Sequence, residues 1–252
     1  MKRKRFVCGD IHGAHKALIQ CLERSGFDYE KDELISLGDV ADGWTEVPEV
    51  FDELLKVNNL VYIMGNHDLW LLDWFETGRA PHIWLSQGGK ATWDAYKRLI
   101  EEGDTTRNVA HENLLDKASY YHVTDDNKLF VHGGYNWHYP IEETLEYNLI
   151  WDRHMWQAAL YWQLQYNREV VDPVTMKIQP LQTVKDYDEV FIGHTTTSQY
   201  DKELKPVHLS NVWNLDQGAG WEGKLTIMDI DSKEYWQSDI VADLYPDIKG
   251  RR

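Results

Sequence analysis

The stretch Phe6-Val7-Cys8-Gly9-Asp10-Ile11-His12 decides the fold, because an apolar run ends in a glycine that an acidic residue and a histidine follow. Similar runs lie at residues 34–37, 61–64, 129–131 and 190–192, and each is followed directly by a glycine or a histidine. Short runs that are apolar throughout are typical of strands buried on both faces. We therefore predict a series of buried strands, each followed directly by polar side chains.

Helical patterns separate the first of these strands. Apolar residues recur at helical spacing over residues 14–22 and 47–55, and Gly26 stands where a C-terminal cap belongs. Residues 69–75 and 93–100 predict two further helices, with a loop at residues 87–90 before the second. Residues 212–215 and 225–230 predict two late strands joined by a glycine-rich turn at residues 218–223. This order predicts α/β layers around a mixed sheet.

The composition predicts one domain over residues 1–252, because no Pro/Gly/Ser-rich linker divides the chain. An aromatic-rich stretch around residues 135–188 predicts an insertion or lid, and ordinary aromatic packing is the alternative. The 42 acidic and 26 basic residues give a formal charge of -16, which argues against general nucleic-acid binding. Two cysteines, no signal-peptide core and no apolar stretch of membrane length predict a cytoplasmic location without membrane attachment.

Polar side chains follow the predicted strands and would meet at one edge of the sheet, where ligands bind in open α/β folds. They are Asp10, His12, Asp39, Asp42, Asn66, His67, Asp68, His132 and His194. Imidazole and carboxylate ligands together suit Mn, Fe or Zn, whereas oxygen ligands alone would suit Mg or Ca. One carboxylate can bridge two cations about 3.5–4 Å apart, and a hydroxide held across both becomes a nucleophile. The residue types therefore predict a two-metal site.

Five motifs resemble the motif series of the PPP phosphatases, which belong to the calcineurin-like metallophosphoesterases. The motifs are Gly9-Asp10-Ile11-His12-Gly13, Gly38-Asp39-Val40-Ala41-Asp42, Gly65-Asn66-His67-Asp68, His132-Gly133-Gly134 and Gly193-His194-Thr195. The resemblance runs from residue 5 to about residue 230, with residues 215–219 as the closing strand and turn. It implies mixed β-sheets packed centrally and flanked by helices, and two divalent metal ions, with Mn²⁺ expected and Fe or Zn as alternatives.

The resemblance also implies a role for each motif residue. One metal would bind Asp10, His12 and the bridging Asp39. The second would bind Asp39, Asn66, His132 and His194.

Three further roles concern the substrate. His67 would protonate the leaving alcohol, and Asp42 would hold the His67 ring charged and oriented. Arg153 would bind the substrate phosphate together with Asn66, and a salt-bridged surface arginine is the alternative reading of Arg153.

Asp68 would cap the following helix or brace the site.

One position departs from the family pattern. The family motif continues Asp-Arg-Gly after the position of Asp42, and its arginine binds substrate phosphate, whereas Gly43 and Trp44 follow here. The change predicts a remodelled phosphate grip without the loss of a metal ligand. We expect Trp44 to pack against the next helix, and stacking on an aromatic or nucleobase substrate is the alternative.

The predicted activity is hydrolysis of phosphomonoesters, with protein phosphoserine, phosphothreonine and phosphotyrosine as the leading substrates. The predicted partners are therefore a phosphorylated protein or a small phosphoester. A symmetrical dinucleoside-polyphosphate or nucleotide phosphohydrolase is one alternative, and a metal-bound interaction module without turnover is another. Four histidines lie outside any motif and are expected at the surface: His82, His138, His154 and His208.

Overall fold

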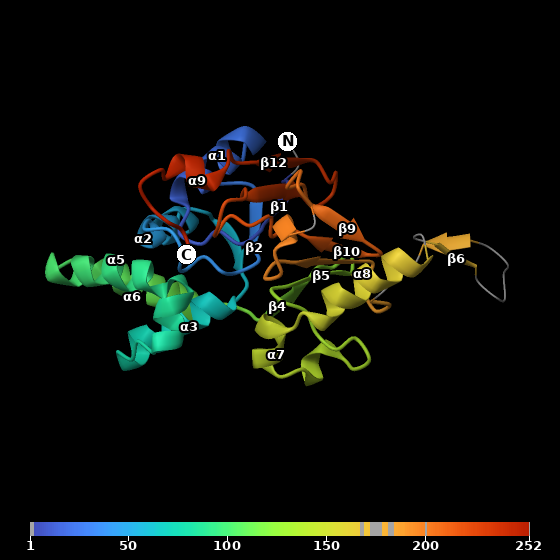
Figure 1. Ribbon diagram of the computed structural model, residues 1–252, viewed down its shortest axis with the longest axis horizontal. Helices are drawn as coiled ribbons and strands as arrows, with labels where there is room; N and C mark the ends of the chain where they lie inside the picture. The colour runs from blue at the N-terminus through green and yellow to red at the C-terminus, as the bar shows by residue number, and fades with distance from the viewer. Residues whose placement is uncertain (1–2, 167–168, 172–177, 181–183, 200, 252) are drawn as a thin grey trace.

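Two five-stranded mixed sheets lie at the centre of the protein, and helices cover their outer faces (Figure 1). The structure, a computed structural model, describes residues 3–166, 169–171, 178–180, 184–199 and 201–251. This architecture confirms the predicted layered α/β fold. Helices in the described ranges all lack the length and apolarity that a membrane crossing requires.

The first sheet has the strand order β12-β11-β1-β2-β3. Strands β1, β2 and β3 run parallel, whereas β11 pairs antiparallel with β1 and β12 antiparallel with β11. Phe6, Val7 and Cys8 of β1 are fully buried, which explains why these three residues of the strand are all apolar. The bounds are β1 Arg5–Cys8, β2 Glu33–Ser36, β3 Asn59–Tyr62, β11 Thr226–Asp229 and β12 Tyr235–Gln237.

The second sheet has the strand order β4-β5-β8-β10-β9, with β5, β8 and β10 parallel. The bounds are β4 Tyr121–Val123, β5 Lys128–Val131, β8 Glu189–Ile192, β9 Val207–Leu209 and β10 Val212–Asn214. The two late strands predicted from the sequence are present as β10 and β11, but they belong to different sheets. The glycine-rich segment 218–223 therefore carries the chain from the second sheet back to the first.

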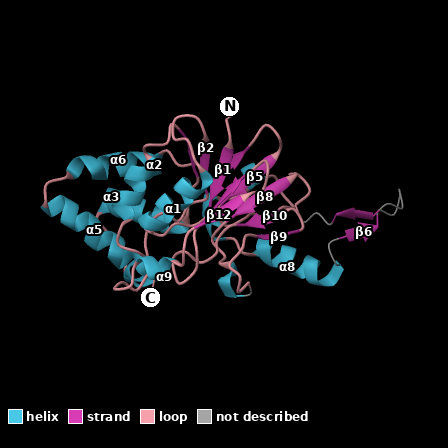
Figure 2. Ribbon diagram, turned by 90° about the horizontal axis from the view of Figure 1, so that it is seen from above, coloured by secondary structure: helices cyan, strands magenta, loops and turns pink. Residues whose placement is uncertain are grey.

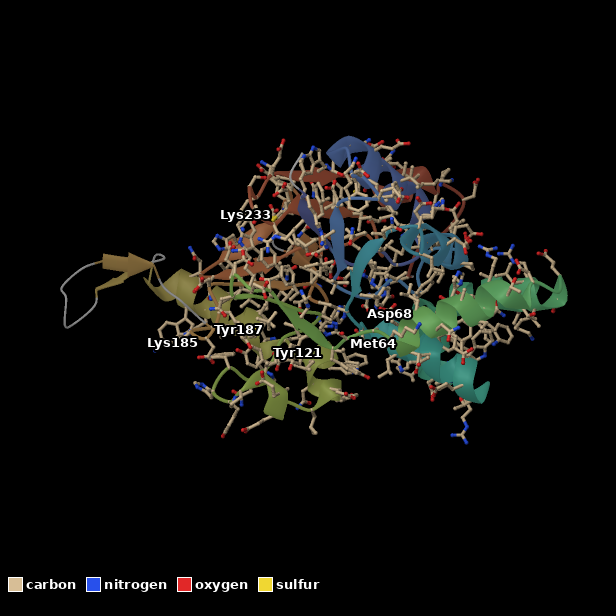
Figure 3. All side chains as sticks on the ribbon, turned by 180° about the vertical axis from the view of Figure 1, so that it is seen from behind. Met64, Asp68, Tyr121, Lys185, Tyr187 and Lys233 are labelled. Atoms are coloured by element: carbon tan, nitrogen blue, oxygen red, sulfur yellow. The ribbon has the colours of Figure 1, made fainter. Side chains whose placement is uncertain are left out.

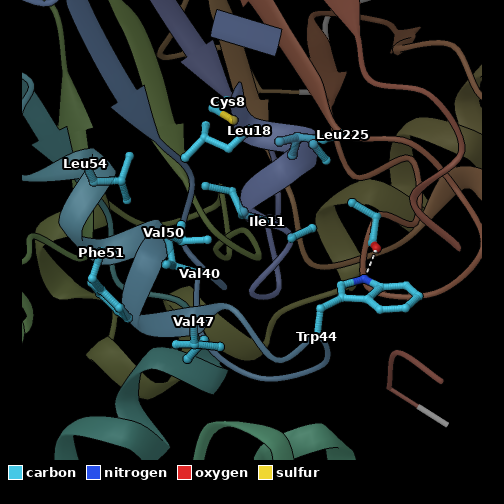
Figure 4. Packing of buried hydrophobic residues seen from close by; sticks show 14 of the residues in the cluster. Cys8, Ile11, Leu18, Val40, Trp44, Val47, Val50, Phe51, Leu54 and Leu225 are labelled. Atoms are coloured by element: carbon cyan, nitrogen blue, oxygen red, sulfur yellow. Dashed lines mark hydrogen bonds between the residues drawn. The ribbon is translucent and has the colours of Figure 1, made fainter. Parts of the chain in front are cut away.

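The core forms three apolar layers. The middle layer joins the two sheets, and in it Phe130 of β5 stacks on Phe191 of β8 with ring centroids 4.8 Å apart. A second layer lies between the first sheet and its helices, where Ile11, Leu18 and Val50 pack together (Figure 4). A third layer covers the outer face of the second sheet. Burial of this apolar surface is the main force that holds both sheets in one unit.

Most helices lie on the side of the first sheet (Figure 2). Gly26 adopts a left-handed conformation (φ 65°) and caps the first of them, as predicted. The bounds are α1 His15–Ser25, α2 Val47–Leu54, α3 Asn66–Thr77, α4 His82–Trp84, α5 Lys90–Glu101, α6 Thr105–Asp116 and α9 Val241–Leu244.

Two predicted boundaries on this side need correction. Helix α3 begins at Asn66, three residues before the predicted 69–75, because the Asp68 carboxylate accepts the N–H of Gly65 at 3.1 Å. Figure 3 labels Met64 and Asp68 on either side of this turn. The predicted loop at 87–90 falls largely in Leu85–Gly89, a π-helical turn that is kinked at Gln87 and Gly88 and leads into α5.

The first part of the aromatic-rich stretch lies over the outer face of the second sheet, and the strand pair that follows residue 166 extends away from the sheet (Figure 1). Its elements are the 3₁₀ turn η2 Ile141–Glu143, the helices α7 Glu146–Trp151 and α8 His154–Tyr166, and the strands β6 Glu169–Val171 and β7 Ile178–Pro180. Tyr135, Met155 and Trp156 are buried against the sheet, so part of the stretch is ordinary core. Residues 167–168, 172–177 and 181–183 of the predicted insertion fall outside the described residues. That residues 1–252 form one domain stays a prediction.

Candidate metal centre

The C-terminal ends of four strands meet at one place between the two sheets. Strands β1 and β2 lead into Asp10, His12 and Asp39, and strands β5 and β8 lead into His132 and His194. All five side chains are at most 8% exposed. The first sheet therefore supplies one half of the site and the second sheet the other.

The backbone around these residues is tight. His12, Asp39 and His194 have φ values of 50°, 50° and 63°, a region that side-chain-bearing residues adopt rarely and mostly at functional sites. A Cβ atom at Gly193 would lie 2.0 Å from Asp10 Oδ1, so only glycine leaves room for that carboxylate. The local sequence thus fixes the position of the polar side chains.

Asp39 is shared by two groups of potential ligands. The groups are Asp10, His12 and Asp39, and Asp39, His132 and His194, and the ligand atoms within each group lie within 4.8 Å of one another. The two oxygens of Asp39 face opposite ways, because Oδ1 is 3.3 Å from His132 Nε2 and Oδ2 is 3.7 Å from His12 Nε2. A carboxylate in this position could bridge two cations.

Two of the imidazole rings are oriented by the backbone. Nδ1 of His132 donates to the carbonyl of Leu37 at 2.7 Å, and Nδ1 of His12 donates to the carbonyl of Ala41 at 3.0 Å. Each bond engages Nδ1 and leaves Nε2 directed into the site, the arrangement that metal-binding histidines require once the ring is neutral. Nε2 of His194 is buried and has no hydrogen-bond partner among the residues that the structure describes. A buried nitrogen without a partner is costly, and a cation would satisfy it.

The electrostatics of the site also favour bound cations. Burial raises the pKa of Asp10 well above its usual value, and the nearby Asp216 carboxylate raises it further. Burial lowers the pKa of His132, but the Asp39 carboxylate outweighs burial and raises that pKa to about 9. Buried carboxylates at this density need positive charge nearby. The residues present therefore fit divalent cations.

Asn66 lies at the edge of the second group, in the first turn of α3. Its Oδ1 is 3.2 Å from His132 Nε2, and its side chain is 3% exposed. An amide oxygen is a suitable ligand for a hard cation. The structure thus brings all six predicted metal ligands to one site, and their role as ligands stays a proposal.

His67 and Asp42 form a buried pair beside the ligands. Nδ1 of His67 is 2.6 Å from Asp42 Oδ2, and both side chains are at most 2% exposed. Asp42 also accepts a bond from Trp84 Nε1 at 2.9 Å and one from Thr92 Oγ1 at 2.7 Å. The hydroxyl of Thr92 in turn accepts the N–H of Asp42 at 2.9 Å. The carboxylate that orients the His67 ring is therefore itself held from several sides.

Asp68 braces the backbone of the site. Its Oδ1 accepts the N–H groups of Val40 and Ala41, both at 2.9 Å, and its Oδ2 accepts the N–H of Gly65. These bonds tie the loop after β2 to the start of α3. The predicted capping and bracing role of Asp68 is confirmed.

A cavity of about 290 Å³ opens beside the candidate ligands. Arg153 lies at its rim, where Nη1 is 3.2 Å from the carbonyl oxygen of His194 and from Thr195 Oγ1. Among the described residues, Arg153 forms no ion pair, so the salt-bridged alternative is not what the structure shows. The lining residues are Asp39, Asn66, His67, Trp70, Ile83, Gln87, Trp151, Arg153, His194 and Arg251.

Trp44 is part of the interior and does not line this cavity. It is 1% exposed, and its Nε1 donates to the carbonyl of Ala219 at 2.8 Å (Figure 4). Its ring stacks on Tyr245 with ring centroids 5.0 Å apart. The prediction that Trp44 packs is confirmed: it belongs to the same buried cluster as Val47 of the next helix, α2, and its ring partner is Tyr245, which follows α9. Because Trp44 is buried, its ring cannot stack on a substrate.

The four histidines without a motif are exposed, as predicted.

Sequence reasoning missed several residues of the site. Trp84 and Thr92 hold Asp42 across 42 and 50 residues of sequence, and Trp70, Trp151 and Arg251 line the cavity. None of them stands in a motif. Glycines that follow strands were the available signal for ligands, and no comparable signal marks side chains that arrive from helices or from distant segments.

The comparisons with known proteins agree with this geometry. A family model described as calcineurin-like phosphoesterase matches residues 4–197. Serine/threonine-protein phosphatase 2 of Escherichia coli (strain K12) is 31% identical over 172 residues, which are 65% of this chain and 74% of that protein.

Two further similarities are more limited. The symmetrical bis(5'-nucleosyl)-tetraphosphatase of Coxiella burnetii (strain Dugway 5J108-111) is 34% identical over 70 residues, 28% of this chain and 24% of that protein. The solved structure of the cold-active protein-tyrosine phosphatase of a psychrophilic Shewanella species has a TM-score of 0.54 and 15% identity, covering 95% of this chain and 81% of that one. At that identity the structural likeness supports the fold alone.

Proposed function

The chain belongs to the calcineurin-like phosphoesterase family and is a metal-dependent phosphoesterase, and we propose that it is a dinuclear phosphatase acting on phosphomonoesters. The observation that carries the proposal is the placement of Asp39 between two ligand groups, next to the buried pair of His67 and Asp42. Such a site combines cation binding with a proton donor. It is built for hydrolysis and exceeds what a binding module needs.

The residues that would hold the cations follow from the geometry. Asp10, His12 and Asp39 would hold one, and Asp39, Asn66, His132 and His194 the other. Mixed imidazole and carboxylate donors suit Mn²⁺, with Fe or Zn as alternatives. When bound, the cations supply an activated water and neutralise charge on the phosphoryl group.

His67 would give a proton to the leaving oxygen. Its Nδ1 is engaged by Asp42, which leaves Nε2 to act, and the ring lines the cavity. The Asp42 carboxylate stabilises the protonated ring, so the pair suits a general acid near neutral pH. Trp84 and Thr92 hold Asp42 in place and thereby keep the ring in one orientation.

Arg153 would bind the substrate phosphate at the rim, together with Asn66. Its guanidinium is exposed, free of a carboxylate partner in the described chain, and anchored through one nitrogen beside His194. A planar guanidinium matches two phosphate oxygens. The open rim and the similarity to a serine/threonine phosphatase favour protein phosphoserine, phosphothreonine or phosphotyrosine as substrate.

Both cysteines are buried free thiols, which suits a reducing compartment such as the cytoplasm.

One observation favours a second candidate, a dinucleoside-polyphosphate or nucleotide phosphohydrolase. Trp70 and Trp151 line the cavity with ring centroids 5.5 Å apart, and a nucleobase could stack on either indole. The similarity to a tetraphosphatase covers only a short segment of both chains.

A direct assay tests the proposal. Purified protein with Mn²⁺ should hydrolyse p-nitrophenyl phosphate, and phosphopeptides should be hydrolysed with a higher kcat/KM than dinucleoside tetraphosphate. The opposite order of kcat/KM would establish the second candidate. Wild-type protein that binds Mn²⁺ but hydrolyses none of these compounds would refute the proposed function.

A further inference from the structure

Arg251 reaches the candidate site from the far end of the sequence. It follows α9, and its backbone N–H donates to the carbonyl of Gly220 at 3.0 Å. Its Nη1 lies 3.2 Å from His12 Nε2, across 239 residues of sequence. The side chain lines the same cavity as Asp39 and His67. A segment outside both sheets thus adds a positive charge directly beside the candidate ligands.

Glycines make room for the Arg251 side chain. A Cβ at Gly43 would lie 3.1 Å from Arg251 Cγ, and a Cβ at Gly220 would lie 2.8 Å from Arg251 Cδ. Gly43 also has a φ of 96°, which disfavours any other residue. The stem of Arg251 therefore runs over the position that directly follows Asp42. A side chain at residue 43 and the observed Arg251 would compete for the same space.

The charge of Arg251 is held in place but is not neutralised. Within the described ranges no carboxylate forms an ion pair with it, whereas most other arginines there, such as Arg5, Arg24 and Arg107, have an acidic partner. Its Nε is buried without a hydrogen-bond partner, and its guanidinium lies 5.1 Å from the ring centre of Trp221. A buried donor without a partner is costly unless a ligand accepts from it.

We propose that Arg251 binds the phosphate of the substrate, on the side of the cavity next to His12. This rests on the proposed function and names a residue for its missing phosphate grip. A cation held by His12 repels the guanidinium, and a phosphate group in the cavity attracts it. The flexible stem allows this short movement, while the backbone bond to Gly220 keeps the residue at the site. The vacant Nε and the second amino group then supply paired donors for phosphate oxygens.

Binding of inorganic phosphate to the Mn²⁺-loaded protein tests the proposal by calorimetry, independently of turnover. Arg251→Ala should weaken phosphate binding about 10- to 100-fold, the range for a charged hydrogen-bonding group. The same variant should raise KM by a similar factor and change kcat by less. Arg251→Lys should recover part of the affinity, since it restores charge without the planar fork. Lys249→Ala removes a positive charge from the same segment, at an exposed residue outside the site cavity, and should match wild type.

Two results with phosphate, and one with metal, would overturn the proposal. Unchanged phosphate affinity in a folded Arg251→Ala protein would mean that Arg251 does not contact the ligand. Tighter phosphate binding or a higher kcat in that variant would mean that Arg251 obstructs the site. Both differ from a failure of the proposed function, in which wild-type protein itself would lack turnover whatever residue 251 is. Mn²⁺ titration of both proteins should give equal stoichiometry, and a loss of metal in the variant would also count against the proposal.

Discussion

The floor and the rim of the site cavity are built from different parts of the molecule. The floor consists of residues at strand ends, such as Asp10, Asp39 and His132, and each is buried and held by the backbone. The rim consists of side chains from helices and outlying segments, such as Arg153 and Arg251, and it is more exposed. Under the proposed function, the floor would carry the chemistry and the rim would select the substrate.

The physical reason lies in burial. A buried charge tolerates few positions, because a displaced ligand or an unpaired carboxylate costs several kcal/mol (~3–5 kcal/mol for breaking a buried pair). An exposed arginine keeps its solvation wherever it lies, so the rim can be rebuilt at little cost to stability. We expect substitutions in the floor to affect kcat and metal content, and substitutions in the rim to affect KM. Four predictions follow this order of effect.

Asp39→Asn should have the largest effect. The residue faces both ligand groups, so its loss should weaken both cation sites and lower kcat at least about a thousandfold, or ~4 kcal/mol. The measurement is Mn²⁺ stoichiometry together with kcat for p-nitrophenyl phosphate. Asp94→Asn, at an exposed residue of α5 paired with Lys90, serves as the control. Wild-type metal content and turnover in Asp39→Asn would rule out a shared ligand.

His67→Asn should lower kcat about 10²- to 10⁴-fold for an alkyl phosphate such as a phosphoserine peptide, with metal content unchanged. The loss should be much smaller for p-nitrophenyl phosphate, because that leaving group needs little protonation. Comparing the two substrates separates a proton donor from a residue that only shapes the site. An equal loss on both substrates would argue against general-acid catalysis by His67.

Trp84→Phe should lower kcat about 5- to 30-fold without loss of metal, since one buried hydrogen bond to Asp42 disappears. The measurement is kcat for a phosphoserine peptide together with Mn²⁺ stoichiometry. Trp213→Phe removes an indole bond to Glu189 at 3.1 Å, and because neither residue lines the site cavity, it should leave kcat unchanged. Equal behaviour of the two variants would mean that Trp84 acts through packing alone.

Arg153→Ala should have the smallest effect, a rise in KM of about three- to tenfold that shrinks at high salt, because the side chain is exposed and screened. His154→Ala, at the exposed neighbouring residue, is the control. A fall in kcat with unchanged KM would place Arg153 in the chemical step and weaken the division between floor and rim.

Much of the fold could be predicted because burial leaves a mark on the local sequence. The sequence predicted the strands β1, β2, β5 and β8 and the Gly26 cap of α1, since each depends on neighbouring residues. The assignment of β10 and β11 to different sheets was not readable. Pairing partners are chosen by long-range packing, and a glycine-rich turn has the same appearance in a hairpin and in a crossover.

The site divides in the same way. The pairs Gly9-Asp10, Gly38-Asp39 and Gly193-His194 indicated candidate ligands directly after the strands. A glycine beside such a residue lets the backbone turn and leaves room for the side chains. Trp84 and Thr92 could not be linked to Asp42 from the sequence, since nothing local distinguishes an indole or hydroxyl that meets a carboxylate from one that packs elsewhere. The sequence could not show the interior position of Trp44, because its partners Tyr245 and Ala219 lie far from it in the sequence and meet it only in the folded protein.

The sequence alone thus identified the residues that would bind metal and donate a proton. They directly follow buried strands, so the strand ends determine where these side chains lie. The partners of those residues were set by the packing of the two sheets and their helices. Arg251 illustrates the difference: in sequence it is an arginine beyond all the motifs, and in the folded protein its Nη1 lies 3.2 Å from His12. Contacts between residues so far apart in the chain depend on the whole fold, because only the folded core brings their backbones together.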